Sequence, residues 1–546
     1  MKTTKCLFLC LALLSGATVL RAQNAPEWQW AVCAGNTGTD IGQSIAIDSQ
    51  GNQYITGHFW GTTTFGSQTL TASGHLIDDI FVAKLDPSGN WLWAVNAGGT
   101  GTGRGYGIAV DDMDNVYVTG RFLGTATFGS QTITGGGILV AKLDPSGNWL
   151  WVATGAINYG EDIAVDSSGN VWVTGSFGGT AIIGSHTLTA SGGQDIFVAK
   201  LNPSGNWIWA ARAGGSNEDN GHDIAVDGAG NAYVTGYFGG TATFGSQTLT
   251  SSGSWDAFVA KLDPDGNWLC AVQAGGSGCE EGYGITVDGA GNAWVTGSYQ
   301  NTATFGNHSL AYGGNGDIFI AKLDPSGNWL WATRAGGGDF DYGHDIVLDG
   351  AGNAWVTGEF RYTSTFGSHT LTAFGGGYSD IFVAKLNTFG NWLWAVQAGD
   401  VYKDIGYGIA VDGEGNALVT GRCMGAACFG SHCLTASGLG DIFVAKLENL
   451  TPVEDEITPQ ALARLHNAYP NPLNRGASAL IKAEIPERTT GNMTIFNLRG
   501  QIVARHKLSP GSQQITFSGE GLPAGVYLYS LQCGDYRETR KLVLLK

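Results

Sequence analysis

The chain has 546 residues, which is too long for one ordinary hydrophobic core, so two or more domains or a repeat array are expected. Glycine accounts for 87 residues, aromatic residues for 11% and charged residues for only 14%, which suits many short strands joined by tight turns and excludes a disordered chain. The formal net charge of −18 argues against a nucleic-acid partner, because phosphate contacts need lysine and arginine.

Residues 1–22 have the pattern of an export signal peptide. Lys2 and Lys5 precede an apolar run, and Ala22 offers a small residue for cleavage. The run is too short to predict a membrane span, and no later stretch would cross a bilayer as a helix. We therefore expect an exported mature chain without a membrane span.

Residues 27–447 contain one unit repeated seven times, about every 60 residues. A segment like "IAVD" closes on an aspartate in each unit, at Asp48, Asp111, Asp166, Asp227, Asp288, Asp349 and Asp412. A later "AKL" segment carries a lysine in each unit, at Lys84, Lys142, Lys200, Lys261, Lys322, Lys385 and Lys446. Such repetition indicates a repeated packing unit rather than a catalytic loop.

Each unit contains four segments with the alternation of β-strands. In residues 222–274 they are "HDIAVD", "NAYVTGYF", "AFVAKLD" and "NWLCAVQA", joined by "DGAGN" and "DPDGN" turns. Four short antiparallel strands, seven times over, predict an all-β chain with a seven-bladed β-propeller. A β-solenoid is the alternative, but its coils are usually shorter, at roughly 20–30 residues.

The stretch "DIFVAKLDPSGNWLWA" at 79–94 is interpreted as the outer hairpin of a blade. Trp91 and Trp93 are two residues apart, so we expect them on one strand face, filling the space between blades; stacking on a sugar is the alternative. A similar segment, 28–33, precedes the first unit, while the last unit lacks its fourth strand. We therefore expect residues 28–33 to supply that strand and close the ring.

The motif "GIAVD…GN.YVTG…FVAKLD..GN" resembles the bacterial β-propeller repeat family of exported proteins, over about 27–447. The resemblance implies the fold, and no common chemistry comes with it.

Residues 448–466 are acidic and contain two prolines, which is typical of a linker, and residues 467–546 alternate like the strands of a second, smaller β-domain. Three separated motifs in this tail resemble the C-terminal sorting domain of type IX secretion substrates. The residues that carry the resemblance are Tyr469, Pro470, Asn471, Pro472, Leu522, Pro523, Gly525, Tyr527, Lys541 and Lys546. It implies an immunoglobulin-like sandwich whose partner is the secretion machinery of the outer membrane. Gly525 is expected to serve a tight approach or a turn before the strand 526–531.

The sequence contains no nucleophile elbow, phosphate-binding loop or HExxH metal motif. The repeated aspartates are interpreted as turn formers, with calcium binding in those loops as the alternative. An ion pair between the aspartate and the lysine of one blade would be structural.

Two sets of variable positions are predicted to face the central mouth of the ring, on the side of the long segments between the second and third strands. The first set is acidic and comprises Asp40, Asp219, Glu280, Asp341 and Asp404. The second set is polar or aromatic and comprises Tyr106, Glu161, His222, Tyr283, His344 and Tyr407, with Gln43 at the same position of the first unit. They form either a solvated rim or a binding site. Apart from weak Ca²⁺ binding by the acids, no cofactor is expected.

Cys428 and Cys433 flank a short hairpin turn, where they would face each other at disulfide distance. A Cys270–Cys279 pair is an alternative disulfide, and a metal site that includes His432 lacks an evident fourth ligand.

These features lead to the hypothesis of a non-enzymatic, exported propeller at the cell surface or in the medium, which binds a protein or a glycan through its loop-rich face. The alternative is an exported hydrolase or lyase with Glu161, His222 and His344 as acid–base groups at the central mouth. A third hypothesis is a structural surface-layer component.

Overall fold

The computed structural model describes residues 26–74, 77–449, 464–485, 490–533 and 536–546. The expected signal peptide and most of the expected linker lie outside these residues. All secondary structure within them is β-strand. The chain divides into two compact units, with the boundary between residues 449 and 450.

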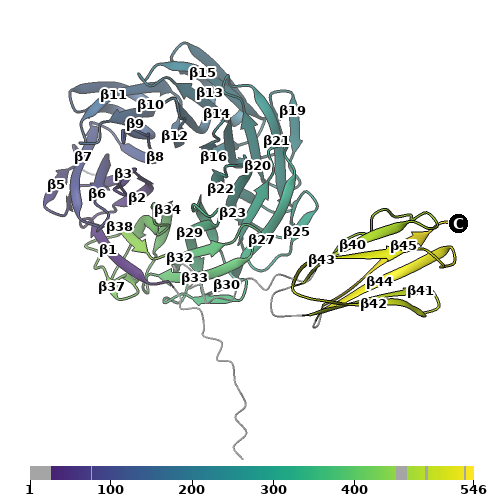
Figure 1. Ribbon diagram of the computed structural model, residues 1–546. Coiled ribbons are helices and arrows are strands. Elements are labelled where there is room, and N and C mark those ends of the chain that lie inside the picture. The colour runs from purple at the N-terminus through teal and green to yellow at the C-terminus, as the bar shows by residue number, and fades with distance from the viewer. Residues whose placement is uncertain (1–25, 75–76, 450–463, 486–489, 534–535) are drawn as a thin grey trace, which may run out of the picture. The chain divides into compact units, whose positions relative to one another are not determined.

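The larger unit is a ring of four-stranded antiparallel blades around an open centre (Figure 1). The first three blades consist of β2 (Ile41–Ile47), β3 (Gln53–Trp60), β6 (Asp78–Leu85) and β7 (Trp91–Gly99); β8 (Gly103–Val110), β9 (Val116–Phe128), β10 (Gln131–Leu143) and β11 (Trp149–Ala156); and β12 (Tyr159–Val165), β13 (Val171–Ile183), β14 (His186–Leu201) and β15 (Trp207–Gly215).

The next three blades repeat this order. They consist of β16 (Asp219–Val226), β17 (Ala232–Phe238), β20 (Asp256–Leu262) and β21 (Trp268–Gly276); β22 (Glu280–Val287), β23 (Ala293–Tyr299), β26 (Asp317–Leu323) and β27 (Trp329–Gly337); and β28 (Tyr342–Leu348), β29 (Ala354–Arg361), β32 (Ser379–Leu386) and β33 (Trp392–Ala398).

The seventh blade joins the two ends of the ring. It consists of β34 (Ile405–Val411), β35 (Ala417–Cys423), β38 (Asp441–Leu447) and, as its outer strand, β1 (Trp28–Ala34). β1 pairs antiparallel with β38, from Trp28 opposite Leu447 to Ala34 opposite Ile442. The prediction that the N-terminal strand closes the ring is therefore confirmed, and β38 has no free edge.

A buried ion pair links the first and third strands of every blade. The aspartate that ends "IAVD" lies 2.8–3.6 Å from the lysine of "AKL" in all seven blades. The same aspartate accepts the backbone N–H groups of its own turn, such as that of Asn52 on Asp48. In six blades the lysine also lies over an aromatic ring of the second strand, at 4.2–4.6 Å. These repeated charges therefore hold each blade together.

The tryptophan pair does not lie on one strand face as expected. Leu85 pairs with Trp91 and Lys84 with Trp93, so Leu92 is an extra residue in the outer strand. This bulge turns the two indoles to opposite faces of the sheet. Trp91 packs against a cluster formed by the first and seventh blades. Trp93 packs against a cluster formed by the first and second blades and donates a hydrogen bond to the Pro145 carbonyl at 3.2 Å. One outer strand thus contacts both neighbouring blades.

The long segments between the second and third strands fold as hairpins, not as loops around the mouth. They are β4 (Thr62–Phe65) with β5 (Gln68–Thr71), β18 (Thr241–Phe244) with β19 (Gln247–Thr250), β24 (Ala303–Phe305) with β25 (His308–Leu310), β30 (Thr363–Phe366) with β31 (His369–Thr372), β36 (Cys428–Phe429) with β37 (His432–Cys433), and the outer parts of β9–β10 and β13–β14. Each hairpin pairs with the end of the preceding blade's outer strand, in all seven cases. The "loop-rich face" is therefore largely a set of contacts between blades.

The smaller unit contains two sheets that share one hydrophobic core. One sheet has the order β39 (Arg464–Leu465), β40 (Ser478–Ile485) and β43 (Gly511–Ser518), and the other β42 (Ile502–Leu508), β41 (Gly491–Asn497), β44 (Gly525–Cys533) and β45 (Tyr536–Leu544). Ile481 and Ile515 of the first sheet and Tyr529 and Leu542 of the second belong to the same buried cluster. This arrangement is a β-sandwich.

Candidate functional site

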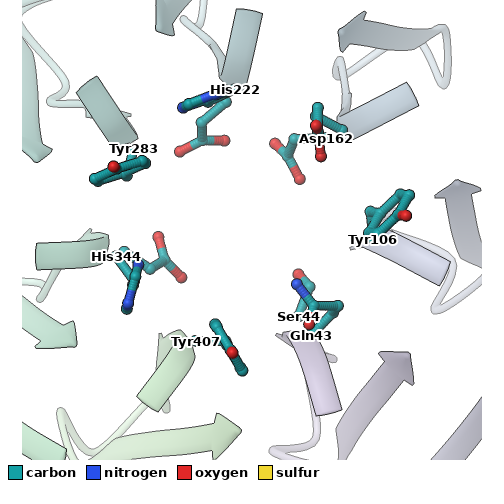
Figure 2. A pocket seen from close by; sticks show the side chains of 11 residues that line it. Gln43, Ser44, Tyr106, Asp162, His222, Tyr283, His344 and Tyr407 are labelled. Carbon is teal, nitrogen blue, oxygen red and sulfur yellow. The ribbon is translucent and has the colours of Figure 1, made fainter. Parts of the chain in front are cut away.

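The innermost strand of each blade contributes to one cavity on the axis of the ring. The cavity has a volume of about 300 Å³, and all seven blades supply residues to it. The lining residues are Gln43, Ser44, Tyr106, Glu161, Asp162, His222, Asp223, Tyr283, His344, Asp345 and Tyr407. Figure 2 shows their side chains arranged around the open centre. Since the blades are alike and these positions differ, the cavity is an asymmetric site on a repetitive scaffold.

Aromatic rings form a continuous row along part of the wall. The imidazole of His222 stacks on the ring of Tyr283, with centroids 5.3 Å apart and planes 3° apart. Tyr283 contacts His344 at 5.7 Å, and His344 contacts Tyr407 at 5.5 Å. This side of the cavity is therefore an aromatic wall, in which one pair of rings is stacked and the next rings are tilted by 55° and 45°.

Three aspartates of the wall also satisfy the inner edges of neighbouring blades. Asp162, Asp223 and Asp345 accept the N–H groups of Ile224, Ile285 and Ile409, each from the next blade, at 3.3, 2.5 and 2.8 Å. These N–H groups belong to the innermost strands and lack a strand partner on that side. The carboxyl groups thus line the cavity and hold the inner ring together.

Burial changes the charge of the cavity wall. It raises the pKa of Glu161 to about 7 and that of Asp345, beside the carboxyl group of Asp223, to about 8. Burial also lowers the pKa of His222 to about 4. At neutral pH His222 is uncharged and Asp345 is largely protonated, so the wall offers hydrogen-bond donors and acceptors with less charge than its composition indicates.

The two predicted sets of mouth residues have different positions. Tyr106, Glu161, His222, Tyr283, His344 and Tyr407 are brought together in the axial cavity. The acids Asp40, Asp219, Glu280, Asp341 and Asp404 are instead fully buried between blades and are not in its lining, so their placement at the mouth was wrong.

Backbone hydrogen bonds explain the position of these acids. Each accepts the N–H group of the residue four positions earlier, at 2.7–2.8 Å, and so closes the connection between two blades. Asp40 also accepts the N–H group of Trp60 at 3.0 Å, and Asp404 that of Met424 at 2.8 Å. These carboxyl groups organise the loops rather than point into the opening.

Sequence reasoning missed Asp162, Asp223 and Asp345. Each stands directly before the isoleucine of the first strand, where the other four blades have serine or glycine, at Ser44, Gly107, Gly284 and Gly408. An alignment of the seven repeats would have found them, because this position is aspartate in three blades and serine or glycine in the other four.

The cavity does not bring together the acid–base groups of the alternative enzyme hypothesis. Tyr283 lies between the imidazoles of His222 and His344, and Glu161 comes from a different blade. Within the described residues, His222 interacts with the Gly282 carbonyl at 3.1 Å, and His344 lies 3.6 Å from Glu359. No hydrogen bond joins any two of His222, His344 and Glu161 within the described residues, so these groups offer no evident pair for concerted acid–base catalysis.

Cys428 and Cys433 face each other across the hairpin of the seventh blade and are joined by a disulfide, with their Cα atoms 4.0 Å apart. Cys270 and Cys279, the alternative pair, carry free thiols, as do Cys33 and Cys423.

The structure brings together two of the three sorting motifs of the smaller unit. The side chain of Asn471 donates to the Lys541 carbonyl at 2.8 Å and accepts the N–H group of Val543 at 3.0 Å. The Tyr527 hydroxyl donates to the Pro523 carbonyl at 2.7 Å within the second motif. The "YPNP" segment is thus bonded to the final strand, and Tyr469 remains 79% exposed.

Other sorting residues differ in their surroundings. Leu522 packs against the core, while Lys541 and Lys546 are exposed. Nothing lies within 4 Å of the position that a Cβ on Gly525 would take, so the expected tight approach there was wrong. Gly525 is the first residue of β44, and a turn ahead of it contains Gly521, with a φ of 74°.

Two protein families match parts of the chain. The secretion system C-terminal sorting domain family matches residues 467–545, and the β-propeller repeat family matches residues 208–237 and 393–422. Both agree with the resemblances that the sequence motifs carry. The repeat matches begin in an outer strand and end in the second strand of the next blade.

Curated relatives share weaker similarity. An uncharacterised WD repeat-containing protein of Acanthamoeba polyphaga mimivirus is 25% identical over 501 residues, covering 72% of this chain and 36% of that protein. The regulatory protein FlaEY of Caulobacter vibrioides is 24% identical over 424 residues, covering 71% of this chain and 42% of that protein. This chain thus spans well under half the length of these relatives.

Solved structures match the chain at low sequence identity. A WD40 β-propeller domain matches with a TM-score of 0.40 and 10% identity, over 78% of this chain and 97% of that one. A fungal alcohol oxidase in complex with copper matches with a TM-score of 0.39 and 12% identity, over 95% of this chain and all of that one.

None of the described residues forms a helix that is long and apolar enough to cross a membrane. The chain combines β-propeller repeats with a secretion system C-terminal sorting domain, and it is exported by type IX secretion to the cell surface or the medium.

Proposed function

We propose that the chain is an exported, non-enzymatic β-propeller that binds a glycan in its axial cavity, while the smaller unit engages the secretion machinery of the outer membrane. One observation carries the proposal: the position that lines this cavity holds glutamine, glutamate, histidine or tyrosine, depending on the blade, in an otherwise repetitive ring. Packing does not require this variation, since the buried positions of the strands carry similar residues in every blade.

The chemistry of the wall favours a glycan. The row from His222 to Tyr407 offers aromatic surface for contact with the C–H groups of a sugar ring. The carboxyl, amide and hydroxyl groups of the wall can both donate to and accept from sugar hydroxyls, particularly where burial keeps an acid such as Asp345 protonated. A cavity of about 300 Å³ is at the small end of ligand pockets, so it would take one or two sugar rings and not a folded protein.

The first test is binding by the mature chain to an array of bacterial and host glycans, followed by titration calorimetry on each hit. Tyr283→Ala should weaken binding roughly fivefold, since removing one aromatic contact costs about 1 kcal/mol. Phe389→Ala is the matched control, because this aromatic side chain is 78% exposed in a turn away from the cavity. Absence of any glycan hit, or equal losses in both variants, would refute the proposal.

A hydrolase acting on the same glycan is the second candidate. The observation that favours it is the pKa of Glu161, which burial raises to about 7, as a general acid requires. Each glycan bound on the array should therefore be incubated with the chain and analysed for cleavage. Turnover that is lost in Glu161→Gln, with binding retained, would replace the non-enzymatic proposal.

A further inference from the structure

The aromatic wall of the axial cavity continues toward the face of the ring that carries the connections between blades. His344 lines the cavity (Figure 2), and the ring of Tyr342 stacks on its imidazole, with centroids 6.0 Å apart and planes 11° apart. Phe340 stacks in turn on Tyr342, at 6.2 Å and 3°. We call these three residues the aromatic ladder. It begins in the cavity and ends in the connection that precedes β28.

A β-bulge brings His344 into the cavity. The pairing between β28 and β29 skips His344, which is therefore an extra residue in its strand. Bulges of this kind re-aim one side chain. The equivalent residue is skipped in all seven blades, from Gln43 in the first to Tyr407 in the seventh, and all seven line the cavity. The scaffold thus directs one variable side chain of each blade into the cavity.

The complete ladder occurs in the sixth blade only. In the other blades, the position of Tyr342 holds Ile41, Arg104, Tyr159, Asn220, Glu281 and Ile405. The position of Phe340 holds Thr39, Thr102, Ile157, Glu218, Cys279 and Lys403. No other blade has aromatic residues at both positions, so the fold of a blade does not require them.

The two outer rings of the ladder keep surface that a ligand can reach. Both Tyr342 and Phe340 are partly exposed. Gly316 of the preceding blade lies beside Phe340, and a Cβ on this glycine would come within 3.1 Å of the phenyl ring. A larger residue at this position would therefore cover the ring. Contiguous exposed apolar surface beside a cavity is typical of ligand-binding sites.

Charged groups of both signs lie beside the ladder. Glu359 pairs with Tyr342 across β28 and β29, so the two side chains share one face of the sheet. The carboxylate of Glu359 lies 3.6 Å from the His344 imidazole and 3.5 Å from the Lys403 ammonium group. Burial and the Glu359 carboxylate raise the pKa of Tyr342, whereas Arg361 acts to lower it. These side chains supply both donors and acceptors for the hydroxyl groups of a sugar.

We propose that the ligand of the axial cavity is the end of a neutral oligosaccharide, whose first one or two sugars enter the cavity and whose following sugars contact Tyr342 and Phe340. This inference rests on the proposed function and adds the length and the charge of the glycan. A cavity of about 300 Å³ takes only the end of such a chain. An acidic glycan is disfavoured, because the protein carries a net charge of −18 and four of the cavity residues are aspartate or glutamate.

The test is calorimetric titration of the mature full-length chain with cello-, xylo-, manno- and malto-oligosaccharides of one to six units. In a series that binds, the affinity should rise about 25-fold from the disaccharide to the tetrasaccharide, since each of two aromatic contacts contributes about fivefold. Oligogalacturonates of the same lengths provide the acidic comparison and should bind more weakly than the neutral series.

Two substitutions introduce residues that other blades carry at the same positions, so the fold should be retained. Tyr342→Ile and Phe340→Thr should each lower the affinity for the tetrasaccharide about fivefold and leave the affinity for the disaccharide unchanged. Tyr159→Ile makes the same change in the third blade, at a residue that does not line the cavity, and is the matched control. It should retain both affinities. If Tyr342→Ile does not fold, Phe340→Thr decides, because Phe340 lies outside the strands.

The results distinguish the ladder from the cavity. Equal affinities for the disaccharide and the tetrasaccharide, or equal losses for both lengths in the two variants, would overturn the role of the ladder and leave glycan binding in the cavity intact. Oligogalacturonates that bind as tightly as the neutral series would overturn the assignment of a neutral chain. A glycan hit on the array without binding of any neutral series would overturn this inference alone, whereas the absence of any glycan binding would refute the proposed function as well.

Discussion

At the scale of single residues, the propeller uses identical side chains for stability and different ones for its candidate site. The aspartate and lysine of each blade recur seven times and bond to each other. The residues of the axial cavity change from blade to blade. The residues that repeat in every blade therefore have a structural role, and those that vary between blades form the candidate site, although both sets contain ionisable groups.

The ion pair of the sixth blade tests the structural role. Lys385 lies 2.8 Å from Asp349 and over the ring of Trp355 at 4.5 Å, and both charged side chains are nearly inaccessible. Lys385→Met leaves the carboxylate buried without its cation and should cost about 3 kcal/mol of unfolding free energy, measured by urea denaturation. Adding Asp349→Asn should recover part of the loss. Lys482→Met is the control, because its ion pair with Glu484 is exposed, and no change is expected there.

The cavity aspartates predict a pH dependence of stability. Burial, with the nearby Asp223, raises the pKa of Asp345 to about 8, well above its value of about 3.9 in an unfolded chain. The folded state therefore holds a proton that the unfolded state releases, so this contribution to stability is lost as pH rises from about 4 to 8, by up to about 1.4 kcal/mol per pH unit.

Asp345→Asn should make the unfolding free energy decline less steeply between pH 5 and pH 8. The exposed turn substitution Asp265→Asn should leave the slope unchanged. A slope in Asp345→Asn that equals that of the unmodified chain would show that Asp345 titrates normally.

At the scale of elements, stability depends on contacts that close the ring and join its blades. β1 completes the seventh blade, and seven hairpins pair with the outer strands of preceding blades. The bulged outer strand of the first blade directs its two tryptophans to the clusters shared with both neighbouring blades. Consequently no blade is independent, and the loss of one element should affect the whole ring.

Deleting residues 24–34 tests closure. The deletion removes the strand that pairs with β38 and exposes the N–H and C=O groups of Asp441–Leu447. We expect a melting temperature at least several degrees lower, together with aggregation in size-exclusion chromatography. A monodisperse deletion variant with an unchanged melting temperature would contradict the pairing.

The disulfide of the seventh blade should add modest stability to one hairpin. Cys428 and Cys433 occupy the places of Thr64 and Thr69, whose hydroxyl groups lie 3.4 Å apart in the first blade. Replacing both cysteines by threonine should therefore preserve the hairpin and cost about 2 kcal/mol or less, the value expected for such a short closed loop. Reducing agent should lower the stability of the unmodified chain equally and leave the double variant unaffected.

Much of this architecture could be predicted, because repeats multiply each local signal. The strand segments, turns and ring closure follow from patterns that recur in every unit. The opposite faces of Trp91 and Trp93 could not be read from spacing, since one bulged residue reverses the alternation. Asp40 and its counterparts were misplaced for a related reason: their backbone hydrogen bonds join segments about 20 residues apart, and local sequence carries no sign of them.

At the scale of the whole molecule, the two units have separate tasks, and export should depend on the smaller one alone. Each unit has its own hydrophobic core. The last residues matter to the sandwich because Leu542 and Leu544 are buried, and because Asn471 of the "YPNP" segment bonds to the backbone of Lys541 and Val543. Removing residues 541–546 takes away the second half of β45 and leaves Asn471 without these partners.

We therefore expect chains without residues 541–546 to fold their propeller and to accumulate in the periplasm of a host with type IX secretion. Fractionation with limited proteolysis measures both location and folding. Asn471→Ala should reduce export by the same route, whereas Asn474→Ala, a neighbouring change outside these hydrogen bonds, should not. Residues 467–546 fused behind an unrelated periplasmic protein should carry it outside the cell. Truncated chains that reached the surface at the normal level would show that secretion recognises a part of the molecule other than the joined "YPNP" segment and final strand.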